Sequence, residues 1–154
     1  MASKASAALT ALAAALATVA GLAAARVVRG SPPLSAGRPQ PSTPCIYLWI
    51  QSATSTRGPV SRLWTVELTV GIYVHSAAAA GTVASIEGAA LELAHEEHVA
   101  ICADPTVAGT VHDVVRYDVT ENGALPGSDG SAPACWMAGS VTLRYDTLGQ
   151  TGGL

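Results

Sequence analysis

Hydrophobic and polar residues alternate most regularly between residues 62 and 75. The even positions from Trp64 onward are apolar, whereas Thr65, Glu67 and Thr69 are polar and His75 ends the odd series. Successive side chains of a strand point to opposite faces, so the pattern predicts a long strand with one face on helices and the other turned to solvent or a partner. The apolar face of this predicted core strand consists of Trp64, Val66, Leu68, Val70, Ile72 and Val74.

A second strand is predicted just before the core strand. Residues 45–51 are apolar on both faces, which is typical of a strand inside a sheet. Residues 52–61 are polar and contain Gly58, so we expect a loop that joins the two strands as a hairpin. Long loops in small domains are often contact elements.

The second half of the chain is predicted to contain a helix followed by two strands. Residues 82–98 have apolar positions at helical spacing, with acidic side chains largely outward. Residues 111–119 and 135–145 read as two more strands, separated by a loop rich in turn-forming residues at 122–133. His95 and His98 are expected in the last turn of the helix, where positive charge suits the helix dipole.

The N-terminal segment has two interpretations. Residues 4–28 are alanine-rich, and leucines recur every three or four positions, which favours a structural helix. The alternative is a secretory signal peptide that is cleaved after residues 23–25. Proline and glycine then mark an extended connector over residues 30–44. We expect a loose tail at residues 148–154.

The order helix, two strands, helix, two strands predicts an α+β fold. We expect a mainly antiparallel sheet of four strands, or slightly more, with two helices packed on one face. Because a chain of 154 residues is the length of one ordinary domain, we treat residues 1–154 as a single domain, with its sheet and helix core at 45–147. The apolar N-terminal run is mostly alanine, so we expect no transmembrane span.

Charge is sparse and unevenly distributed. Charged residues make up 12% of the chain, about half the usual share. The first acidic residue is Glu67, and all basic residues except Arg116 and Arg144 precede it. Such a division can give one subunit two oppositely charged faces that suit head-to-tail contact. The basic part has too few interleaved aromatic residues for a nucleic-acid surface.

Candidate chemistry is weak. His95, His98, Cys102 and His112 match no zinc spacing, and we interpret the histidines as solvated or helix-capping. No nucleophile elbow, triad or phosphate-binding loop is present in the sequence. We therefore expect no enzyme activity, catalytic residue, metal site or cofactor. Small buried thiols are expected at the cysteines, with a Cys45–Cys135 bridge as the alternative.

The whole pattern resembles the tail terminator (tail completion) proteins of long-tailed bacteriophages, the lambda type in particular. The resemblance rests on the N-terminal leucine stripe, the entry P-C-I-Y-L-W-I, the long strand L-W-T-V-E-L-T-V-G-I-Y-V and the helix at 86–98. It continues in the phrase A-D-P-T-V-A-G-T-V-H-D-V and the closing strand G-S-V-T-L-R-Y-D. It covers nearly the whole chain.

This resemblance implies a structural virion protein at the head-proximal end of the tail, made in the bacterial cytoplasm. Such proteins form a hexameric ring that caps the tail tube, ends its polymerisation and joins the tail to the neck or head-completion protein. DNA passes through the ring without sequence recognition, and an acidic lumen would repel its phosphates. We predict that Arg57, Gly58 and Arg62 contact the tube protein or a neighbouring subunit.

Two other functions remain open from the sequence. One is another phage neck or minor tail protein, such as a head–tail connector. The other is a small secreted binding module with a cleaved signal peptide.

Overall fold

The structure is a computed structural model that describes residues 3–32, 34–35, 38–39, 44–59, 62–77, 83–125 and 134–148. Within these residues two α-helices lie on a five-stranded sheet, and a small two-stranded ribbon lies apart from it. The elements in chain order are α1 (Lys4–Leu16), the short 3-10 helix η1 (Ala20–Leu22), β1 (Arg26–Arg29), β2 (Leu34–Ser35), β3 (Arg38–Pro39), β4 (Cys45–Arg57), β5 (Leu63–Ala77), α2 (Val83–Cys102), β6 (Asp113–Leu125) and β7 (Ala134–Leu148).

The main sheet has the strand order β1-β4-β5-β7-β6. Strands β4, β5, β7 and β6 pair antiparallel, while β1 pairs parallel with the start of β4, from Arg26 opposite Cys45 to Arg29 opposite Leu48. The α+β class is thereby confirmed. The predicted four-stranded, mainly antiparallel sheet becomes five-stranded and mixed, because residues assigned to the N-terminal helix form β1 instead.

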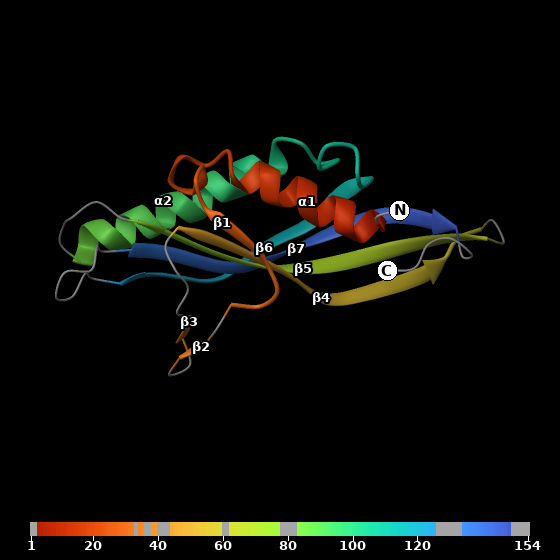
Figure 1. Ribbon diagram of the computed structural model, residues 1–154. Helices are drawn as coiled ribbons and strands as arrows, with labels where there is room; N and C mark the ends of the chain where they lie inside the picture. Colours follow the sequence, from red (N-terminus) through yellow and green to blue (C-terminus); the bar gives the residue numbers. More distant parts are fainter. Residues whose placement is uncertain are drawn as a thin grey trace.

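Both helices cover the same face of the sheet, and the β2–β3 ribbon lies on the other side (Figure 1). On the helix side of β5, Val66, Leu68, Val70, Ile72 and Val74 are buried, whereas Trp64 at the strand start is half-buried. The helices contribute Leu12, Leu16, Leu93 and Ile101, among others, to this core. Burial of such side chains from water is the main favourable term that holds the two layers together.

The N-terminal helix is shorter than the predicted 4–28. Ser3 caps it by accepting the Ser6 N–H at 3.1 Å, and α1 ends at Leu16. Val19 and Leu22 prolong the leucine stripe and are buried, but they reach the core from a bend and from η1. Apolar side chains can therefore remain buried beyond the end of a helix, because burial depends on where a residue lies in the fold and not on whether it belongs to that helix.

The predicted loop at 52–61 was wrong, because β4 continues to Arg57 and pairs with β5 up to Trp64. Strand β4 ends before Gly58, whose N–H donates to the Leu63 carbonyl at 2.8 Å, and residues 60–61 of the predicted loop lie outside the described residues. Residues 52–57 look like a loop because most of their side chains are exposed, so no apolar face is needed. Similarly, β6 runs to Leu125, beyond the predicted loop start at residue 122.

Helix α2 also exceeds its prediction and ends at Cys102, which places His95 and His98 before the final turn. An Asp104 turn follows and leads into β6. The predicted tail at 148–154 overlaps the end of β7 at Leu148, and residues 149–154 lie outside the described residues. Much of the predicted connector, at residues 33, 36–37 and 40–43, also lies outside them.

Candidate interaction surfaces

The face of the sheet that points away from the helices is here named the open sheet face, and it is the underside of the sheet in Figure 1. The strand register determines which side chains belong to it, because alternate residues share a face. Its polar part consists of Ser52, Thr54, Thr56, Thr65, Glu67, Thr69, Asp113, Arg116, Asp118, Glu121, Ser140, Thr142, Arg144 and Asp146.

Hydrogen bonds between neighbouring strands order this polar part. The Thr65 hydroxyl donates to Asp146 at 2.8 Å, and the hydroxyls of Thr69 and Thr142 lie 3.2 Å apart. Arg144 donates to Glu67 at 3.0 Å across β5 and β7. Such cross-strand pairs each contribute a fraction of a kcal/mol and fix side-chain positions. The open sheet face is therefore a patterned polar surface.

Carboxylates outnumber cations on the open sheet face. Both of its arginines are engaged there, since Arg116 pairs with Asp118 and Arg144 pairs with Glu67. These exposed ion pairs add little to stability. These pairs neutralise the two arginines. The carboxylates of Asp113 and Glu121 then give the surface a net negative charge.

The other half of the open sheet face is aromatic. Tyr73 and Trp136 stack with ring centroids 5.9 Å apart, and Tyr47 meets Tyr73 edge-on at 6.2 Å. Trp49 lies over Gly71, where an added Cβ would come within 2.2 Å of the indole ring. The expected solvent-facing odd side of the core strand was therefore wrong from Gly71 to His75, where the side chains are buried.

Burial in this aromatic half changes the titration of its polar groups. Desolvation lowers the pKa of His75, which favours the neutral imidazole. Desolvation likewise raises the pKa of the Cys45 thiol to about 12, so this cysteine is protonated and unreactive at neutral pH. The cluster is suited to packing and lacks an activated nucleophile.

The predicted contact residues lie together at the tip of the β4–β5 hairpin. Arg57 ends β4, Gly58 begins the turn and Arg62 precedes β5, and both arginine side chains are exposed. This tip is at the opposite end of the hairpin from the Cys45–His75 pair. Their role as contact residues remains a prediction.

Sequence reasoning missed one unusual residue, Glu97 of α2. Its side chain is fully buried, and neither carboxylate oxygen has a hydrogen-bond partner among the described residues. Desolvation raises its pKa to about 9, so the carboxyl is protonated at neutral pH. A signal was available, because Glu97 follows Leu93 by four positions and precedes Ile101 by four, within the buried stripe.

The other candidate ligands do not converge. The His98 ring lies 3.8 Å from the Cys102 sulfur and packs on Tyr117, whereas His112 pairs with Asp146 at 3.1 Å. Within the described part of the chain, no group of three or more His, Cys, Asp or Glu side chains is arranged to hold a metal ion. Cys45, Cys102 and Cys135 are free thiols; Cys45 and Cys135 are buried as predicted, whereas the prediction was wrong for Cys102, which is exposed.

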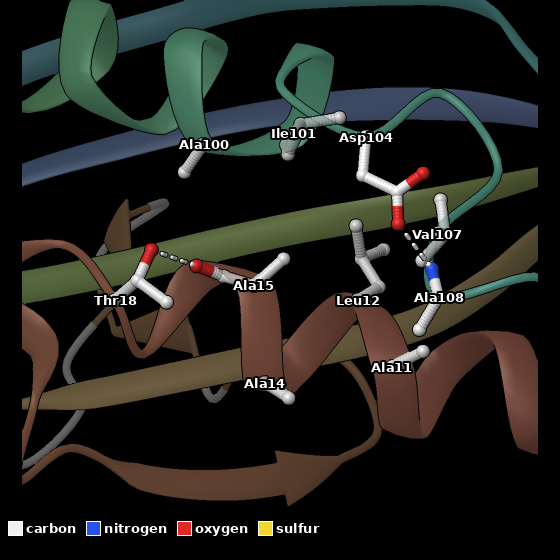
Figure 2. A pocket seen from close by; sticks show the side chains of 10 residues that line it. All are labelled: Ala11, Leu12, Ala14, Ala15, Thr18, Ala100, Ile101, Asp104, Val107 and Ala108. Atoms are coloured by element: carbon white, nitrogen blue, oxygen red, sulfur yellow. Dashed lines mark hydrogen bonds between the residues drawn. The ribbon is translucent and has the colours of Figure 1, made fainter.

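A small pocket of about 230 Å³ separates α1 from the end of α2 (Figure 2). Leu12 and Ala15 line it from one side, and Ile101 from the other. Its one carboxylate, Asp104, accepts the Ala108 N–H at 2.7 Å and bonds from Thr106, which lower its pKa. Because that carboxylate is engaged by its own turn, the pocket offers a ligand mainly methyl groups.

No protein-family model matches this chain, and a search of curated proteins returned no significant match. Of the helices in the described residues, none is both long and apolar enough to span a membrane.

Proposed function

We propose that the chain is a ring-forming phage tail protein of the tail terminator type. In this function, copies of the chain close into a hexameric ring on the end of the tail tube, stop its growth and present a surface to the neck. The observation that carries the proposal is the polar part of the open sheet face, which has a net negative charge.

Such a surface suits the wall of a channel through which DNA must pass without binding. Its carboxylates repel phosphates, while both arginines are neutralised by Glu67 and Asp118 on the same face. Threonine and serine hydroxyls keep the wall hydrated, and among the described residues of this polar part DNA meets no row of unpaired cations. Proteins that hold DNA use the opposite arrangement of charges.

The position of α1 supports this proposal over a secreted module with a cleaved leader. Ala8, Leu12 and Leu16 are completely buried against the sheet, and Leu22 of η1 extends the same core. Removing these residues would expose the apolar face of β4 and β5 to water. The segment therefore contributes core structure, although α1 itself ends at Leu16 and not at the predicted residue 28.

Native mass spectrometry over a range of protein concentrations tests the proposal. We expect full-length subunits in a closed six-fold species, alone or after addition of assembled tail tubes. Electron microscopy of the mixtures should then show the protein at one end of each tube. A full-length monomer that leaves both tube ends bare would refute the proposal, and binding at the neck without the tube would favour a head–tail connector.

A further inference from the structure

The two edges of the main sheet remain open. Strand β1 covers β4 only from Cys45 to Leu48, so the outer edge of β4 has no partner strand beyond that point within the described residues. At the other side of the sheet, β6 pairs with β7 alone. Open edges present unpaired backbone groups and are templates for further pairing.

Exposed apolar side chains concentrate at these edges. Val27 and Ile50 are 43% and 46% exposed on the β1–β4 side, and Val115 and Val119 are 40% and 42% exposed on β6. Among large apolar side chains of the described residues, the only others so exposed are Leu91 and Val99 of α2. Apolar side chains at a sheet edge gain from burial when another strand docks there.

The exposed side chains lie at interleaved heights. When the register is followed across β5 and β7, Val119 is level with Leu48, and Arg116, the neighbour of Val115, is level with Ser52. Ile50 of β4 therefore lies at a height between the two valines of β6. Without a shift along the strands, the part of the neighbour's β6 from Val119 onward would coincide with β1, so only residues 113–118 of β6 can lie along the uncovered edge of β4.

Strand direction fits the same placement. Strands β4, β5, β7 and β6 alternate in direction, so β6 runs opposite to β4. A copy rotated about an axis along the strands keeps the direction of its own β4. The β6 edge of one copy and the β4 edge of the next are consequently antiparallel, as in the rest of the sheet.

The charges of the two edges are complementary. On the open sheet face the β1–β4 side carries Arg26, whereas β6 carries Asp113, Asp118 and Glu121 against a single arginine; Arg29 lies on the helix side, where it donates to Thr10 of α1. Two β6 edges brought together would place like charges against one another, and a head-to-tail arrangement avoids this repulsion.

We propose that the sheet continues from one copy of the chain to the next, with residues 113–118 of β6 in one copy pairing along residues 49–54 of β4 in its neighbour. The inference rests on the proposed ring and names the contact that closes it. Regular pairing along this edge is interrupted by the register shift of β6 between Val114 and Arg116 and by the shift of β4 between Ile50 and Ser52. Each joint is therefore short, and closure of the ring adds to its stability.

Cysteine cross-linking of the full-length chain tests this contact. Ser52→Cys and Arg116→Cys are introduced together in a Cys102→Ser background, because Cys102 is the exposed natural thiol and the other two are buried. Both sites are exposed, on the open sheet face, and at the same height. After mild oxidation of the assembled ring, denaturing gels should show a ladder of covalent species up to the hexamer.

Three controls give each outcome a meaning. The first control is the double variant Ser52→Cys with Glu121→Cys, whose cysteines are on the same face but at mismatched heights. The other two controls are the single variants Ser52→Cys and Arg116→Cys, in which the partner thiol is missing. All three should remain monomeric on the gel. A ring in native mass spectrometry without a ladder would overturn the edge contact and leave the proposed function intact. Absence of any ring would overturn the proposed function. Dimers from Ser52→Cys alone would instead indicate a two-fold β4–β4 contact and also overturn the proposal.

Discussion

At the scale of single residues, Glu97 is the most consequential side chain. It is fully buried in the inner stripe of α2. Tyr117 of β6 and Cys135 of β7 are titratable groups close enough to interact electrostatically with its carboxyl group. Burial without partners disfavours the carboxylate and also raises the pKa values of Tyr117 and Cys135. The folded protein therefore holds a proton on Glu97 that the unfolded chain releases near pH 4.

This difference predicts how stability changes with pH. Because the folded-state pKa is about 9 and the unfolded value about 4.3, the unfavourable contribution of Glu97 is absent in acid and grows as pH rises between these values. Glu97→Gln removes the titration. We expect the variant to gain stability over the wild type between pH 5 and pH 8, by up to roughly 1.4 kcal/mol per pH unit.

Urea unfolding at pH 5, 6, 7 and 8 measures this effect. Glu96→Gln is the matched control, since Glu96 is the exposed neighbour on the same helix, and its pH profile should follow the wild type. Parallel profiles for wild type and Glu97→Gln would show that the carboxyl is solvated in the folded protein.

At the scale of elements, a glycine on one strand seats a tryptophan from the next. Gly71 of β5 is paired with Trp49 of β4, and the indole ring occupies the space above the glycine. Gly123 of β6 and Trp136 of β7 form the same arrangement, with an added Cβ within 2.9 Å of that indole. These pairs build the aromatic half of the open sheet face and fix the register of the strands that carry them.

Gly71→Ala should therefore destabilise the protein. The new Cβ would overlap the Trp49 ring, and we expect a loss of about 1–3 kcal/mol together with a changed near-ultraviolet signal from the displaced indole. Gly88→Ala is the control, because nothing lies within 4 Å of a Cβ there and alanine favours the helix by up to about 1 kcal/mol. Denaturant unfolding compares the two; equal stability of Gly71→Ala and wild type would contradict the packing described.

At the scale of the whole molecule, the subunit offers distinct surfaces for distinct contacts. The helix layer closes the core, the polar part of the open sheet face is acidic, the sheet edges expose apolar side chains, and the β4–β5 hairpin tip is basic. In the proposed ring, this division would let side-by-side contacts form without using the surface proposed to face the channel. It would also leave the hairpin tip available for a contact along the axis of that ring.

The hairpin tip can be tested separately from the ring. Arg57→Glu with Arg62→Glu should leave folding nearly unchanged, since both side chains are exposed, but should weaken capture by tail tubes. Arg57→Lys with Arg62→Lys keeps the charge and is expected to retain capture. Tail length measured by electron microscopy and infectivity are the readouts; normal values for the glutamate variant would rule out a role in tube contact.

The sequence predicted the order of elements but misplaced several of their ends. Alternation located the core strand, and helical spacing located both helices, because each pattern reflects burial on one side of one element. The prediction for residues 52–57 failed because an edge segment with exposed side chains has no apolar pattern. The prediction for residues 26–29 failed because their strand is short and depends on pairing with β4, a contact distant in sequence.

The amphipathic elements, the sparse charge and the division between a basic first part and an acidic remainder can all be read from the order of residues. Which faces meet depends on contacts made in the folded chain. Only the fold buries Glu97, stacks Tyr73 on Trp136 and brings Arg144 to Glu67, because these contacts join elements that are separate along the chain. The local sequence shows whether a side chain is apolar. The register and order of the strands determine which neighbour covers it.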